Sequence, residues 1–304
     1  MHTTPSTTRT ATGAAWGLLG VLAFSFTVPL TRIAVADLPP LFVGAGRAVV
    51  AAALAASALA LLRQPLPTPR QWARLAVVAG GVVVGFPLLT SFALETASAS
   101  HGAVVIAVLP AATAVAAVLR GREHPPVRFW VAAGMGAVAA VVFAALHSVG
   151  PIGFVWSDLL LFGAVIAAAV GYAEGGMLAR ELGAWQTVSW ALVLASPVMI
   201  GLTAGSATAD LWTASAEAWW AFAYLGVVSM FLGFFAWYRG LAIGPMSSVS
   251  QTQLVQPVLT LCWAALLLGE HLTWQTIIGG LAVIACAAIA VRARQSPVAR
   301  SVSR

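Results

Sequence analysis

The sequence predicts an all-α integral membrane protein with ten transmembrane helices, arranged as two inverted five-helix repeats. Three observations lead to this fold class: the composition, a series of ten apolar stretches, and an internal repetition. The chain has 304 residues, of which 61% are hydrophobic and 8% are charged, and its mean hydropathy is +0.95. Soluble domains have about 45–50% apolar and about 25% charged residues. The composition therefore excludes a soluble protein.

Each apolar stretch ends at a proline, a charge or a polar cluster. A continuous apolar run of about 20 residues satisfies its backbone amides within a membrane only as an α-helix, whereas a membrane barrel shows short alternating strands. No such alternation occurs here, so we expect helices at about 14–35, 41–62, 74–94, 101–119, 128–147, 157–179, 186–205, 218–238, 247–268 and 274–292.

The arginines predict the orientation, because cytoplasmic loops retain basic residues. All fifteen basic residues are arginines, and with the N-terminus inside, thirteen of them fall on the inner side, leaving Arg32 and Arg47 towards the outer side. The segment Met1–Gly13 lacks the apolar core of a removable signal peptide, so the first helix is expected to stay in the protein. We expect a multi-pass protein of a bacterial-type cytoplasmic (inner) membrane, with both termini in the cytoplasm.

The internal repetition appears when the chain is shifted by 147 residues. Pro110 then falls on Pro257. The eight other identities between positions 94 and 124 and their counterparts are one Ser, one Thr, one Glu and one His pair and four apolar matches. Units of five helices, an odd number, insert with opposite orientations. Inverted repeats are typical of secondary transporters, whose binding site lies near the membrane midplane between the halves. We expect residues 1–150 and 151–304 to form the two repeats.

Three segments carry a resemblance to a known family: residues 156–179, 218–241 and above all 254–273, with Pro257 followed by Leu268-Gly269-Glu270. They resemble the drug/metabolite transporter (DMT) superfamily, of the ten-helix EamA type, and the resemblance covers nearly the whole chain. It implies export of amino acids, other small metabolites or drugs from the cytoplasm. One position departs from the family pattern, since Gln256 stands where the family often has Glu.

Two charged residues within predicted spans are candidates for function, because charges at membrane depth are costly unless they are paired or face water. Glu174 is a candidate for proton coupling or cation recognition; the alternative is an interfacial acid that pairs with an arginine such as Arg180. Arg47 is a candidate for binding a substrate carboxylate through its planar guanidinium. Its alternative is outward snorkelling, or pairing with Asp37 or Glu95.

Polar residues also form a stripe along the ninth predicted helix: Ser250, Gln253, Gln256 and Thr260 recur at helical spacing. This stripe faces either a solvated cavity or a hydrogen-bonded helix interface, and we favour the cavity. Ser25 and Pro29 are consistent with a broken or cavity-lining first helix, although serine also bonds its own helix without consequence.

Prolines 110 and 257 are expected to bend equivalent helices, with or without a gating role. Tyr172 either stacks on a substrate or packs in the core, and the core is the better interpretation. His101, at the outer mouth of the fourth helix, is expected to be a solvated residue.

The sequence thus favours a secondary-active transporter that exports a small molecule by alternating access, with a small-molecule substrate, the lipid bilayer as partner and possible proton coupling. We expect a monomer or homodimer, with no metal, no cofactor and no nucleic-acid partner. Two alternatives stay open: an exchanger of phosphorylated or anionic metabolites, which needs more cavity cations than Arg47, and a membrane-embedded enzyme or a receptor without transport. Motif searches for enzymes find neither HExxH, GxSxG nor a phosphate-binding loop.

Overall fold

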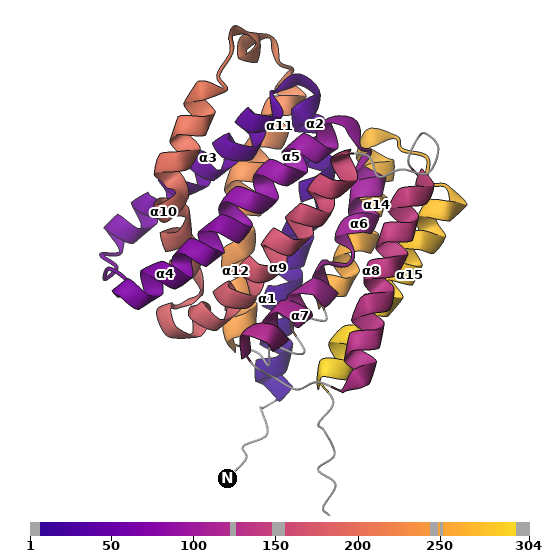
Figure 1. Ribbon diagram of the computed structural model, residues 1–304. Coiled ribbons are helices and arrows are strands. Elements are labelled where there is room, and N and C mark those ends of the chain that lie inside the picture. Colours follow the sequence, from indigo (N-terminus) through magenta and orange to yellow (C-terminus); the bar gives the residue numbers. More distant parts are fainter. Residues whose placement is uncertain (1–6, 122–125, 148–155, 244–248, 250–251, 296–304) are drawn as a thin grey trace, which may run out of the picture.

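The computed structural model describes residues 7–121, 126–147, 156–243, 249 and 252–295, and within these ranges every regular element is a helix. The helices stand side by side as one bundle, with the beginning of α1 and the end of α15 at the same end of it (Figure 1). In chain order the elements are α1 (Thr7–Ser25), α2 (Thr27–Asp37), α3 (Pro40–Leu61), α4 (Pro69–Val78), the π-helical η1 (Ala79–Gly85), α5 (Phe86–Thr96), α6 (Ala99–Ile106), α7 (Leu109–Gly121), α8 (Val127–His147), α9 (Trp156–Leu182), α10 (Ala184–Gly205), the 3-10 segment η2 (Ala209–Thr213), α11 (Ala216–Tyr224), the π-helical η3 (Leu225–Leu232), α12 (Gly233–Ile243), the 3-10 segment η4 (Gln253–Val255), α14 (Gln256–Leu268) and α15 (Trp274–Gln295).

Seven helical runs of the described chain are long and apolar enough to cross a membrane: Ala11–Asp37, Pro40–Leu61, Pro69–Thr96, Ala99–Arg120, Trp156–Leu182, Ala184–Gly205 and Ala216–Ile243. The other three predicted stretches fall on shorter apolar helices, Val127–Phe143, Gln253–Leu268 and Trp274–Ala290. The protein is therefore an all-helical, multi-pass membrane protein. A count of ten spans does not follow from helix length alone.

Element boundaries recur at the 147-residue interval seen in the sequence. α5 has its counterpart in α12 and α7 in α14, each with the same first and last positions, and the two π-helical segments also correspond. Thr68 caps the start of α4, where its hydroxyl accepts from the Gln71 N–H, and Ser215 caps α11 at the corresponding position. One element breaks the correspondence, because α9 is continuous whereas its counterpart is divided into α1 and α2.

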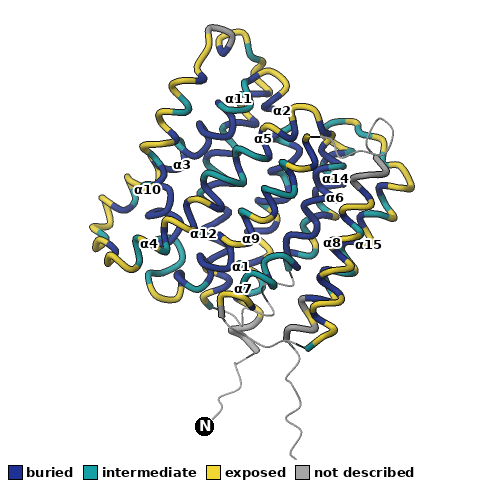
Figure 2. The backbone as a smooth tube through the Cα atoms, in the orientation of Figure 1, coloured by how far each residue is buried: buried dark blue, intermediate teal, exposed yellow. Residues whose placement is uncertain are grey.

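Equivalent helices also meet in space. α3 packs against α10, and α8 packs against α15 at one edge of the bundle (Figure 1). The buried positions form a continuous inner layer through α1, α5, α6, α9 and α12, with exposed positions towards the periphery (Figure 2).

Glycines set the distance between α1 and α12, which pack along their length. A Cβ added to Gly240 would lie 2.7 Å from the backbone nitrogen of Gly17, and one added to Gly20 would lie 2.9 Å from that of Trp237. Small residues let two helix backbones approach closely, which supplies dispersion energy where lipid offers no hydrophobic driving force. This contact joins the first and second halves of the chain.

Candidate functional site

The first span breaks at Phe26, between α1 and α2, for a reason visible in the sequence. Pro29 has no N–H, so the carbonyl of Ser25, four residues earlier, lacks its usual helical donor. The hydroxyl of Thr260 on α14 lies 2.9 Å from this carbonyl and also 2.9 Å from Gln256 O, so its single proton is shared between the two acceptors. Trp263 Nε1 donates to Ser25 Oγ at 2.9 Å, and the Trp263 ring stacks on Phe26 with centroids 4.3 Å apart. The break is thus held by the second half of the chain.

Replacement of Thr260 by valine should destabilise the protein by about 1–3 kcal/mol, because the Ser25 carbonyl loses this donor in a buried place. The matched control is Thr187→Val: Thr187 is equally buried, but its hydroxyl bonds Gly183 O, which already accepts from the Thr187 N–H. Thermal unfolding in detergent measures both variants. Equal melting temperatures for the two would show that the Thr260 bond does not stabilise the break.

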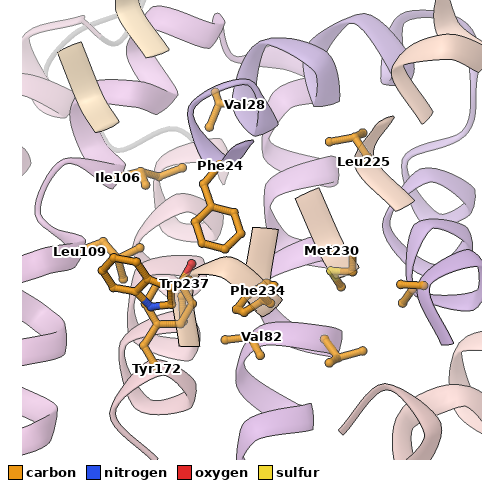
Figure 3. Close-up of a cluster of buried hydrophobic side chains, with 14 of the residues drawn as sticks. Phe24, Val28, Val82, Ile106, Leu109, Tyr172, Leu225, Met230, Phe234 and Trp237 are labelled. Carbon is orange, nitrogen blue, oxygen red and sulfur yellow. The ribbon is translucent and has the colours of Figure 1, made fainter. Parts of the chain in front are cut away.

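A closed cavity lies beside the break, at the centre of the bundle. Its volume open to the centre of a water molecule is about 20 Å³, which is room for about one water. Figure 3 shows part of its wall, with Phe24 between Ile106 and Leu109 on one side and Met230 on the other. The wall is completed by Thr27, Val28, Arg47, Val82, Phe86, Pro87, Tyr172, Ser229, Phe234 and Gln256.

Several wall residues correspond at the 147-residue interval: Val82 with Ser229, Pro87 with Phe234, and Leu109 with Gln256. In two of these pairs the first half supplies an apolar side chain and the second half a polar one. Val82 and Ser229 belong to the two π-helical segments, and such segments occur frequently at functional sites. Ser229 also shares a 2.7 Å hydrogen bond with Thr27 across the cavity wall.

Arg47 brings the only charge among these wall residues, and its side chain is 1% exposed. It donates to Pro87 O at 2.8 Å, Thr90 Oγ1 at 3.1 Å and Thr31 Oγ1 at 3.4 Å, while its Nε is buried without a partner. The alternative prediction, that Arg47 pairs with Asp37 or Glu95, is wrong, because no ion pair to Arg47 occurs in the described part of the chain.

A smaller hollow continues from this cavity along α14, and Gln253, Gln256, Thr260 and Pro257 line it together with Val28 and Pro110. Gln253 is 3% exposed with its Nε2 unpartnered, and Gln256 Oε1 is likewise buried and unpartnered. Three members of the predicted polar stripe therefore face one space. Ser250, the fourth, lies outside the described residues.

The prolines lie where helices are interrupted. Pro110 is the second residue of α7, after the turn at Ala107 and Val108, and Pro257 is the second residue of α14, after η4. Tyr172 reaches the cavity and also contacts Phe24 and Phe234 in the aromatic core. Ser25 and Pro29 are absent from the cavity wall; they shape the break in the first span.

Glu174 also lies away from the central cavity, at the end of the bundle where α1 begins. Its carboxylate is 3% exposed and pairs with Arg74 Nε of α4 and, at 2.8 Å, with Arg120 Nε of α7. Arg74 also pairs with Glu181, about two turns further along α9 than Glu174. The partners are therefore Arg74 and Arg120, and the sequence-based choice of Arg180 is wrong. The cluster joins two helices of the first half to one of the second.

The opposite end carries three more contacts between the halves. Both oxygens of the Glu270 carboxylate accept backbone N–H bonds at the start of α6, from Ala99 and Ser100, each 2.8 Å long. An acid at a helix N-terminus is favourable because it meets free N–H groups and the positive end of the helix dipole. His101 Nε2 lies 2.6 Å from Asp158 Oδ1, and Asp37 accepts from the Ser215 N–H at 3.1 Å.

These contacts correct one expectation. His101 is not a solvated residue, since it pairs with Asp158 and lies against Phe143. Asp158, the third residue of α9, is 1% exposed. Sequence reasoning missed the His101–Asp158 pair, although a histidine and an acid near the ends of two spans on the same side were an available signal.

A larger hollow, of about 1090 Å³, lies between α7, α8 and α9 and reaches Glu174 and Arg120 at one end. Its wall is otherwise almost entirely apolar and includes exposed residues such as Ile166 and Trp130. Such a surface is what a membrane span presents to lipid chains. We therefore place the candidate site in the small central cavity, where the polar groups converge.

A multi-pass helical bundle with a small central cavity that is lined by residues of both halves is typical of membrane transporters. The chain belongs to the EamA-like transporter family, whose family model matches residues 11–145 and again residues 155–292. It is 42% identical over 287 residues to the "Uncharacterized transporter YdeK" of Bacillus subtilis (strain 168), a match that covers 93% of this chain and 98% of the relative.

A solved crystal structure, described only as "Crystal structure of protein", has the same fold, with a TM-score of 0.64 at 19% sequence identity. The match covers 94% of this chain and 100% of that chain. The protein is thus a membrane transporter of the DMT type. Its substrate is a small molecule, and its surroundings are the lipid bilayer.

Proposed function

We propose that this transporter is a secondary-active exporter, which carries amino acids or other small metabolites or drugs out of the cytoplasm by alternating access. The observation that carries the proposal is the position of the central cavity. It lies between the Glu174 cluster at one end of the bundle and the contacts of Glu270, His101 and Asp37 at the other end, and both sets of contacts join the two halves of the chain. With both sets closed, the cavity holds about one water. Opening either set alone would connect the cavity to one side of the membrane.

The proposed architecture is ten spans in two inverted repeats, residues 1–150 and 151–304. It is supported by the recurrence of helix boundaries at the 147-residue interval and by the packing of equivalent helices α3 with α10 and α8 with α15. The cavity lies within one chain, so a single chain is the proposed transport unit, whether the protein is a monomer or a homodimer.

The proposed orientation places both termini in the cytoplasm of a cell with a bacterial-type inner membrane. Arg74 and Arg120 lie at the end of the bundle where α1 begins, in agreement with the retention of basic residues on the cytoplasmic side. The Glu174 cluster is then the cytoplasmic gate, and Glu270, His101 and Asp37 belong to the outer gate. Protonation of Glu174 would release two arginines at once, which offers a route for proton coupling.

Alternating access predicts that one cavity position is reachable from each side of the membrane. In a background without Cys262 and Cys286, Ser229→Cys should react with a membrane-impermeant thiol reagent added to either side. Met199→Cys is the control, because Met199 is 0% exposed and absent from the cavity wall. Labelling of Ser229→Cys from one side only would contradict alternating access.

Transport itself is tested by efflux of amino acids, other small metabolites including apolar carboxylates, and toxic analogues from cells with and without the protein. Protein-dependent efflux of at least one compound is expected. A receptor or a membrane enzyme would change neither efflux nor sensitivity to the analogues.

A further inference from the structure

One buried group is not explained by export alone: the Arg47 guanidinium forms no ion pair with any residue that the structure describes. A buried cation is costly unless it is paired with an anion. Its three hydrogen bonds go to neutral acceptors, and its Nε has no partner. Of the five N–H groups of an arginine, two are then left for a ligand.

Resting on the proposed transport function, we infer that Arg47 is the binding residue for a single carboxylate, and that the substrate is a monoanion with an apolar body. The cavity wall holds one positive charge and no acid. A carboxylate matches the planar guanidinium in shape and neutralises its positive charge. A doubly charged phosphate would bring an excess negative charge into an apolar surrounding.

Among the described wall residues no acid occurs, which also argues against a cationic or zwitterionic substrate and narrows the proposed substrates to metabolites or drugs other than zwitterionic amino acids. An ammonium group in the cavity would meet Arg47 as a like charge, with neutral oxygens such as that of Gln256 as its only acceptors. Glu174, the acid that a cation would need, is already paired with two arginines and lies outside the wall. Phe24, Tyr172 and Phe234 suit an aromatic or aliphatic body.

A purely structural role for Arg47 has a comparison within the same chain. Arg32 also ties its helix to α5, through bonds to the carbonyls of Leu94 at 3.0 Å and Glu95 at 2.8 Å. Arg32 is only half-buried and is absent from the cavity wall. Tethering of α5 therefore does not require an arginine in the cavity, and Arg32 provides a matched control.

The test uses four probes that share a phenylethyl body and differ in charge: 3-phenylpropionate, 3-phenylpropionamide, phenylalanine and phenethylamine. Binding to the purified full-length protein is measured by isothermal titration at pH 7, which avoids the passive permeation of weak acids and amines. We expect the carboxylate to bind at least about tenfold more tightly than the amide, and more tightly than the zwitterion or the amine. Equal binding of acid and amide, preference for the amine or the zwitterion, or no binding of the acid overturns the inference.

Variants assign the preference to Arg47. Arg47→Gln should remove the discrimination between acid and amide, Arg47→Lys should keep part of it, and Arg32→Gln should leave it unchanged. If Arg47→Gln does not fold, Arg47→Lys and the wild-type probe series still decide. Full discrimination in a folded Arg47→Gln protein overturns the assignment. If the probes show no preference for the carboxylate, but efflux is intact and Ser229→Cys is labelled from both sides, then the inference about Arg47 is wrong and the proposed transport function is retained.

Discussion

Glu174→Gln should abolish the accumulation of substrate driven by a pH gradient in proteoliposomes, while exchange down a substrate gradient continues. The variant keeps the size and hydrogen-bonding ability of the side chain but cannot exchange a proton. Its amide also cannot neutralise Arg74 and Arg120, so the proposed cytoplasmic gate loses its charge-assisted bonds at every pH. The measurement is uptake with and without an imposed pH gradient, at equal protein insertion.

Glu181→Gln is the matched control, because Glu181 also pairs with Arg74 but is half exposed, and the ion pair of Arg120 is with Glu174. Exposed ion pairs contribute little, so gradient-driven accumulation should persist in this variant. Unchanged gradient-driven uptake in Glu174→Gln would show that Glu174 is a structural ion-pair partner and that any coupling proton binds elsewhere.

Gly240→Ala should destabilise the folded protein by about 1–3 kcal/mol, at the upper end of this range if the backbone cannot adjust. The new methyl group would meet the backbone of α1 at Gly17, and backbone moves less readily than a side chain. The two helices would separate along a contact that joins the two halves. Thermal unfolding in detergent and the yield of folded protein measure the effect.

Gly201→Ala provides the comparison on α10, because a Cβ at Gly201 meets no atom within 4 Å. Alanine has the higher helix propensity, so this variant should be as stable as the wild type or more stable by up to about 1 kcal/mol. If both variants melt at the wild-type temperature, close approach of α1 and α12 does not limit stability.

The spans could be predicted from the sequence because hydropathy is a local property of about 20 consecutive residues. The break at Phe26 was partly predictable as well, since Pro29 removes the donor for Ser25 within the same helix. What holds the break was not predictable, because Thr260 and Trp263 come from α14, more than 230 residues further along the chain.

The residues of the candidate site were predictable only in part for the same reason, because contacts between distant segments are not visible in the sequence. Arg47 and Gln256 were identified because polar groups at membrane depth are exceptional. Ser229 was not, since hydroxyl residues are common in spans and only its hydrogen bond to Thr27 reveals it. The partners of Glu174 depend on how α4 and α7 pack against α9, which a one-dimensional pattern of charges does not contain.

The two ends of the bundle are held by different kinds of bond. One end relies on an acid shared by two guanidinium groups, and the other on a carboxylate at a helix start together with a histidine–aspartate pair. Under the proposed alternating access, these two sets of bonds contribute to the free-energy difference between the two open forms, and salt in one compartment would reach one set before the other. Each compartment would then exert its own bias on which way the empty carrier faces.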